Sequence, residues 1–199
     1  MGGGALRARP LLFAAAAAFF IGAASGLAPG PSTTRAAAAA AAPSAKPWIR
    51  TAARVRIDAP VEVCFAGYAD LTRMPEWCPM LAEVAWTNRT LGTSEWRMGY
   101  KGISVGWTAE NLEVAPPSLL RWTSRAGVPN HGAASFAAAG AAACDCEVAI
   151  SYQMPRVLSD IVETPRVQRF ISRLLERTLL SFGRTMKAEH AGAAAGNVR

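Results

Sequence analysis

The sequence predicts an α+β domain. We expect a curved antiparallel sheet of about seven strands wrapped on a long C-terminal helix, with two short helices after the first strand. Two observations support this fold class. Short segments with alternating apolar and polar residues follow one another between turn signals from residue 81 to residue 154. After Pro165, apolar residues instead recur with the period of an α-helix. Because a sheet of this size twists, that helix should cover its concave apolar face.

The first elements are expected to be one strand and two short helices. Apolar and basic residues alternate toward the end of residues 49–57, which predicts a strand. Asp58 is a residue type that caps helices, and Pro60 suits a first helical turn because its missing N–H costs nothing there. Short helices are therefore expected over residues 61–68 and 71–77.

The remaining strands and the last helix follow in order. The strands are expected over residues 81–89, 94–100, 103–114, 119–125, 131–138 and 144–154. Thr164 suits an N-cap, with Pro165 in the first helical position. The apolar stripe of this helix consists of Val167, Phe170, Ile171, Leu174, Leu175, Leu179, Phe182 and Met186. Residues 191–199 are expected to form a disordered tail.

The N-terminal residues predict targeting segments rather than part of the fold. Residues 1–26 have two arginines, then an apolar run, then small residues, as in a secretory signal peptide. Residues 27–48 combine Ala and Pro with hydroxyl and basic residues and no acid, as in a transit peptide. Together they resemble a bipartite plastid presequence, which predicts a plastid protein with its folded domain over residues 49–190. The alternatives are a secreted protein with an Ala/Pro-rich linker, or one long transit peptide.

The basic residues are concentrated in this leader. The 199-residue chain has 21 Lys and Arg against 14 Asp and Glu. Seven of the basic residues and none of the acidic ones lie in the first 57 residues, so the rest of the chain is balanced. A high net charge normally indicates nucleic acid or an anionic membrane as the partner. Because the excess belongs to the leader, we predict no nucleic-acid partner for the folded domain.

The cysteines indicate neither a disulfide framework nor a metal site. Cys64 and Cys78 lie fourteen residues apart, and Cys144 and Cys146 fall on the same face of a predicted strand. No CxxC pair is present, and no histidine stands at a metal-ligand spacing from them. We expect reduced structural thiols, no metal and no cofactor.

Several motifs point to a known family. They are Val55-Arg56-Ile57-Asp58-Ala59-Pro60-Val61-Glu62 with Phe65, Met74-Pro75 with Trp77, Trp107 with Ala109-Glu110, Arg121-Trp122, and Val128-Pro129-Asn130 with Gly132. With these motifs, residues 50–188 resemble the polyketide cyclase/dehydrase and lipid-transport branch of the START-like (SRPBCC) superfamily, related to coenzyme Q-binding proteins. The resemblance implies a helix-grip fold. It implies no single activity, because the family includes lipid carriers, quinone binders and cyclases.

The space between such a sheet and its helix is a place for an apolar ligand. Five tryptophans fall between residues 77 and 122. So many large rings in a small domain must either define the core or line a cavity. The candidate cavity-lining residues are Trp77, Trp86, Trp107, Trp122, Phe136, Tyr152, Phe170 and Leu174. Each of them is equally compatible with an ordinary core position. Arg121 and Asn130 are candidates to bind a polar head group, and the alternative for Arg121 is a solvated outer face.

Catalytic residues are not assigned. His131, beside a loop, and Glu110, at the end of an apolar strand, are the candidates for an acid or base. A solvent-exposed loop histidine and an outward-pointing carboxylate are the alternatives. The sequence has no recognisable Ser/His/Asp set, glycine-rich phosphate loop or metal cluster.

These observations predict binding or transport of a hydrophobic small molecule, such as a lipid, quinone or pigment-related compound, without turnover. One alternative is a cyclase or dehydratase that uses polar groups in the cavity. Another is an assembly or interaction module in a plastid. We expect a monomer that touches a membrane transiently to exchange its ligand.

Overall fold

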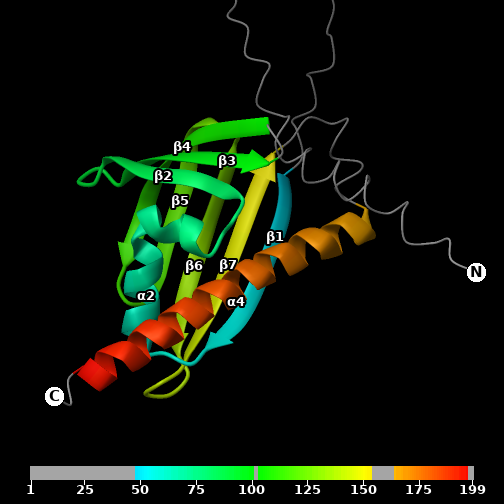
Figure 1. Ribbon diagram of the computed structural model, residues 1–199. Helices are drawn as coiled ribbons and strands as arrows, with labels where there is room; N and C mark the ends of the chain where they lie inside the picture. Colours follow the sequence, from blue (N-terminus) through cyan, green and yellow to red (C-terminus); the bar gives the residue numbers. More distant parts are fainter. Residues whose placement is uncertain (1–47, 101–102, 154–163, 197–199) are drawn as a thin grey trace, which may run out of the picture.

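The computed structural model describes residues 48–100, 103–153 and 164–196 of the chain (Figure 1). The predicted segments 1–26 and 27–48 lie outside these residues, except for Trp48, which begins the first strand. The elements in order are β1 (Trp48–Ile57), α2 (Val61–Ala69), the 3-10 helix η1 (Leu71–Glu76), β2 (Leu81–Asn88), β3 (Thr93–Tyr100), β4 (Ile103–Ala115), β5 (Leu119–Gly127), β6 (Asn130–Ala138), β7 (Cys144–Gln153) and α4 (Pro165–Gly196).

The seven strands form one antiparallel sheet in the order β1-β7-β6-β5-β4-β3-β2. Consecutive strands are neighbours from β2 to β7, and the first strand then pairs with the last along its full length. The long helix α4 lies across one face of the curved sheet, and α2 packs beside its C-terminal half (Figure 1). This architecture confirms the predicted fold class.

Strand β1 follows the predicted alternation. Val55 and Ile57 are buried, whereas Arg54 and Arg56 are exposed on the other face. Both arginines bind the carboxylate of Asp145 on the paired strand β7, at 3.0 and 2.9 Å. The apolar side of β1 contacts α4, so the edge strand of the sheet also forms part of the core.

Local details of the helices differ from the expectations. Asp58 does not cap α2, because the helix begins later, with Pro60 in the N-cap position and no side-chain cap. The Asp58 carboxylate instead accepts a hydrogen bond from Lys187 on α4, at 2.8 Å. The second short helix is a single 3-10 segment that ends one residue before Trp77. At the other terminus, α4 continues to Gly196 through residues expected to be disordered, since alanine favours the helix.

The core between the sheet and α4 is packed most tightly where α2 lies. The rings of Phe65 and Tyr68 contact Phe136 with centroid distances of 5.8 and 5.6 Å. From α4, the fully buried side chains Phe182 and Met186 pack into the same region. No helix among the described residues is long and apolar enough to cross a membrane.

Candidate ligand-binding cavity

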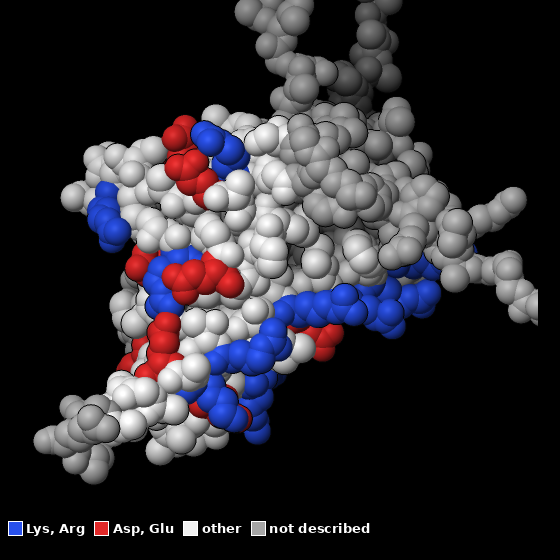
Figure 2. Space-filling model, viewed as in Figure 1, with Lys and Arg blue, Asp and Glu red and all other residues white. Residues whose placement is uncertain are grey.

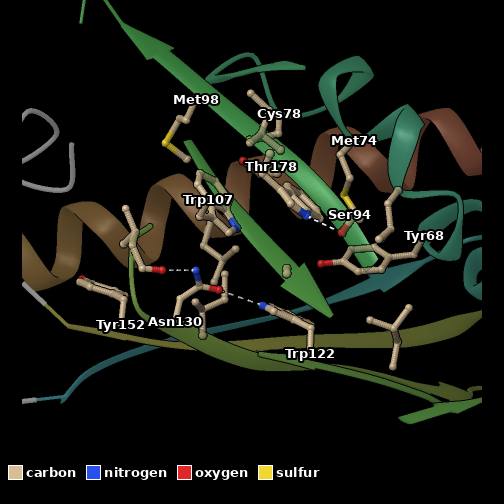
Figure 3. A pocket seen from close by; sticks show the side chains of 18 of the residues that line it. Tyr68, Met74, Cys78, Ser94, Met98, Trp107, Trp122, Asn130, Tyr152 and Thr178 are labelled. Carbon is tan, nitrogen blue, oxygen red and sulfur yellow. Dashed lines mark hydrogen bonds between the residues drawn. The ribbon is translucent and has the colours of Figure 1, made fainter. Parts of the chain in front are cut away.

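A cavity of about 170 Å³ lies between the sheet and α4 (Figure 3). Its wall is built from α2 and η1, from strands β2 to β7, and from the middle of α4. The lining residues are Tyr68, Leu71, Met74, Trp77, Cys78, Leu81, Ser94, Trp96, Met98, Val105, Trp107, Ala109, Asn111, Leu120, Trp122, Val128, Asn130, Ile150, Tyr152, Leu175, Thr178 and Leu179.

Aromatic rings make up much of this wall. Trp96 and Trp107, opposite one another on β3 and β4, stack with centroids 5.7 Å apart and an angle of 14° between their planes. Trp77, also in the wall, packs against Phe182 of α4, with centroids 4.9 Å apart. Because strand side chains alternate between the two faces, every second residue of β3 and β4 contributes to one apolar surface.

Polar wall residues hold the indole rings in place. The Trp122 N–H donates to Oδ1 of Asn130 at 3.2 Å, and the Trp96 N–H donates to Oγ of Ser94 at 2.9 Å. Asn130 in turn donates from Nδ2 to the carbonyl of Val128 at 2.9 Å. These bonds satisfy buried donors and leave the ring surfaces facing the cavity. The polar groups therefore position the wall as well as line it.

The ionisable groups of the described wall are Tyr68, Cys78 and Tyr152, and it contains no Asp, Glu, His, Lys or Arg. Burial raises the pKa of the Tyr152 hydroxyl to about 12. Burial also raises the pKa of Tyr68 and that of the Cys78 thiol above their ordinary values. All three groups are therefore protonated near neutral pH, and none is suited to accept a proton there.

Several candidate residues identified from the sequence lie in this wall: Trp77, Trp107, Trp122, Tyr152 and Asn130. Two of these, Trp122 and Asn130, are joined by the hydrogen bond described above. Trp107, Trp122, Asn130 and Tyr152 come together because each points inward from a different strand of one curved sheet, whereas Trp77 follows η1.

The other aromatic and aliphatic candidates lie elsewhere. Trp86 is half-buried on β2, with the Arg89 guanidinium 5.5 Å from its ring. Phe136 belongs to the packed part of the core beside α2. Phe170 and Leu174 are half-buried on α4 outside the wall. Successive helix residues are about 100° apart, so Leu175 rather than Leu174 faces the cavity.

The charged candidates lie outside the cavity. Arg121 is exposed and pairs with Glu113 at 3.4 Å, because it alternates with the inward-pointing Leu120 and Trp122. Glu110 pairs with Arg125 across strands β4 and β5, and this contact lowers the pKa of its carboxyl. For these two residues the structure supports the outward-facing alternative.

His131 follows Asn130 on β6 and therefore points to the opposite side of the sheet. It is exposed, and its ring lies 4.5 Å from the ring of Trp48. It does not contact the cavity. Among the described residues, no group of His, Cys, Asp and Glu is arranged to hold a metal ion.

Sequence reasoning missed several wall residues. The alternation of Ser94, Trp96 and Met98 on β3 is a signal that could have identified this face. No comparable signal marked Tyr68, which belongs to a short helix whose residues are buried on several sides. Its position in the wall depends on where α2 docks.

The family model described as "Polyketide cyclase / dehydrase and lipid transport" matches residues 57–175, more than half of the chain. The chain belongs to this family. No curated protein matches it.

Solved structures show the same fold at low identity. TTHA0849 from Thermus thermophilus is 18% identical with a TM-score of 0.61, over 71% of this chain and 99% of that one. The Zhui aromatase/cyclase from a Streptomyces species is 13% identical with a TM-score of 0.55, over 72% and 94%. A START superfamily protein from Mycobacterium smegmatis is 13% identical with a TM-score of 0.53, over 72% and 98%. The family member described here therefore has a START-like, helix-grip fold.

Proposed function

We propose that this protein binds a hydrophobic small molecule in the cavity between the sheet and α4, without chemical turnover. The observation that supports this most directly is the cavity itself, with stacked tryptophans in its wall. Apolar cavities of roughly 150 Å³ stay dry and take up ligands such as benzene. Burying apolar surface of the guest would supply most of the affinity.

The size of the cavity narrows the ligand class. A volume of about 170 Å³ suits a molecule of one or two rings, or the ring portion of a larger one. Drug-sized ligands occupy pockets of roughly 300–1,000 Å³, and extended lipids are at least as large. Of the lipid, quinone and pigment-related compounds considered, compact ring systems are therefore the preferred ligands.

The alternative is a cyclase or dehydratase, which the aromatase/cyclase among the structural neighbours suggests. Such an enzyme needs a group that exchanges protons near neutral pH. The ionisable groups of the described wall are two tyrosines and a cysteine with raised pKa values. This chemistry favours binding over catalysis. An assembly module would suit a filled interior better than a hollow one.

Uptake of tetralin, a two-ring hydrocarbon, tests the proposal. We expect the full chain to bind tetralin with quenching or enhancement of tryptophan fluorescence. Trp107→Ala should weaken binding about tenfold or more, because it removes a large apolar contact surface. His131→Ala is the matched control on the outer face and should bind as the wild type does.

Two results would contradict the proposal. One is a wild-type protein that takes up no tetralin at its solubility limit. The other is a His131→Ala variant that loses its cellular function while uptake persists, which would favour an enzyme. The plastid location is likewise proposed, on the basis of the leader alone, and a fluorescent fusion of the full chain would test it.

A further inference from the structure

The Tyr68 side chain presents a polar group to an otherwise apolar space. Its ring is held between Phe136 and Phe182 in edge-to-face contacts, with centroids 5.6 and 5.5 Å away. Its hydroxyl points into the cavity (Figure 3). Because both neighbouring rings are buried, the hydroxyl has a defined position rather than a range of rotamers.

Two other polar side chains of the wall, Asn130 and Thr178, are already engaged. Asn130 accepts from Trp122 and donates to Val128, as described above. The hydroxyl of Thr178 donates to the carbonyl of Leu174 at 3.1 Å. In contrast, no residue that the structure describes forms a hydrogen bond with the Tyr68 hydroxyl.

A hydroxyl that faces an apolar cavity without a protein partner is costly, and a guest that offers an acceptor would relieve that cost. Burial raises the pKa of this phenol, so it keeps its proton and acts as a donor over the whole physiological range. A protonated phenol can both donate and accept a hydrogen bond, and its proton is available to an acceptor oxygen of the ligand.

We propose that Tyr68 is the polar anchor of the cavity and donates a hydrogen bond to a carbonyl oxygen of a compact apolar ring compound. This inference rests on the proposed function and specifies its ligand class as ring ketones and related carbonyl compounds. The rings would occupy the tryptophan-lined wall while the oxygen meets the Tyr68 hydroxyl.

Tetralin and 1-tetralone, which differ by one carbonyl group, separate this inference from the proposed function. We expect Tyr68→Phe to bind tetralin as the wild type does. The same substitution should reduce the affinity for 1-tetralone relative to tetralin by about tenfold, the effect of one hydrogen bond. Tyr152→Phe is the matched control, because the Tyr152 hydroxyl oxygen is enclosed by protein atoms.

Three results of this experiment would each overturn a different part of the proposal. If the wild type binds neither compound, the proposed function itself is overturned. If both bind and Tyr68→Phe leaves the ratio of the two dissociation constants unchanged, the anchor is overturned. If Tyr152→Phe changes the ratio as much as Tyr68→Phe, the assignment to Tyr68 is overturned as well.

A second inference rests on the opposite face of α4. There, basic side chains follow one another at intervals of three or four residues, with one leucine among them, which places them on a single stripe. We call this the arginine stripe; it consists of Arg166, Arg169, Arg173, Arg177, Leu180, Arg184 and Lys187. Figure 2 shows a band of basic side chains along the helix.

The stripe differs from the arginines of the sheet in its partners. Arg97, Arg121 and Arg125 each pair with a glutamate on a neighbouring strand. No arginine of the stripe forms an ion pair with any residue of the described ranges, and only Lys187 does, with Asp58. The helix has six basic and two acidic residues, so it is strongly positive, although basic and acidic residues balance over residues 58–199 as a whole.

The geometry of the stripe suits a flat anionic surface. From Arg166 to Lys187 it spans roughly 30 Å at the rise of an α-helix. Leu180, within the stripe, is 43% exposed, which suits shallow contact rather than insertion. Guanidinium groups bind phosphates in a bidentate manner, and the apolar cargo proposed above would partition into a bilayer.

We infer that the arginine stripe docks on anionic membranes, where ligand is exchanged. The test is co-sedimentation of the full chain with vesicles of phosphatidylcholine alone or mixed with phosphatidylglycerol. We expect binding only to the anionic vesicles, with a steep loss as salt is added. Arg169→Gln/Arg173→Gln/Arg177→Gln should weaken it about 100-fold, at about fivefold for each charge.

The control variant is Arg97→Gln/Arg121→Gln/Arg125→Gln, which removes the same charge from exposed positions of the sheet. Both variants retain the basic leader, so the difference between them reports on the helix. An equal loss in the two variants would overturn the inference. So would binding of the stripe to an acidic protein without any affinity for anionic vesicles.

Discussion

The space between the sheet and α4 has a filled end and a hollow end, although the same helix face covers both. At the filled end, Phe182 and Met186 pack against α2 with no exposure to solvent. At the hollow end, Leu175 and Leu179 face the stacked Trp96 and Trp107 across the cavity. The two ends differ in the residues that lie opposite the helix.

Small residues make the filled end possible. Gly67 on α2 has no side chain, and a methyl group there would overlap the Met186 sulfur. Gly183 on α4 similarly lies against Ile57, whose side chain would be 3.1 Å from an added Cβ atom. Close backbone approach removes free volume at this end. At the hollow end, flat indole rings line the wall and leave room between the layers.

The largest effect is expected from emptying the filled end. Phe182→Ala should lower the free energy of unfolding by about 3–5 kcal/mol, because it removes a fully buried ring and leaves a void. Urea unfolding measures this change. Leu180→Ala, two residues away but exposed, is the control and should change it by roughly 0.5 kcal/mol or less. Equal effects would mean that the two faces of α4 do not differ as described.

A matched pair of substitutions compares the two ends directly. Ala109 lines the cavity, whereas Ala134 is equally buried in the core but outside the wall. Ala109→Leu should fill the cavity, abolish tetralin binding and leave stability within about 1 kcal/mol of the wild type. Ala134→Leu should overpack the core and destabilise the protein by about 1–3 kcal/mol. The comparison fails if Ala109→Leu destabilises the fold as much as Ala134→Leu does.

The smallest effect concerns the surface of the sheet rather than either end. Hydrogen bonds from Arg56 and then Arg54 lower the pKa of the Asp145 carboxyl from 3.8 to about 2. Because the Asp145 carboxyl has a lower pKa in the folded protein than in the unfolded chain, its ion pairs stabilise the fold at pH values above the unfolded pKa. This stabilisation is lost as the pH falls toward 2. The pair is exposed, so Asp145→Asn should be slightly destabilising at neutral pH. Thermal melts of the two proteins should converge as the pH falls through this range, and a constant gap would argue against the ion pair.

Much of the fold could be predicted because it depends on local periodicity. The two-residue alternation of β1, β4 and β7 and the apolar stripe of α4 identify which side of each element is buried. The predicted ends of β4 and β7 lie within a residue of the observed ends, whereas α4 extends beyond its predicted end. Outward placement of Arg121 and Glu110 also follows from alternation.

Periodicity does not predict which residues pack against the buried side of each element. Phe136 and Trp107 both occupy inward positions of strands, yet one lies in the packed core and the other in the cavity wall. Whether an inward-facing residue lies in the packed core or in the cavity wall depends on where α2 docks and how far the sheet curves. Both involve residues distant in sequence. The sequence by itself determined the elements, their buried faces and the family resemblance. Only the tertiary structure decided where the hollow lies and that Tyr68 points into it, because free volume is a property of how the layers meet.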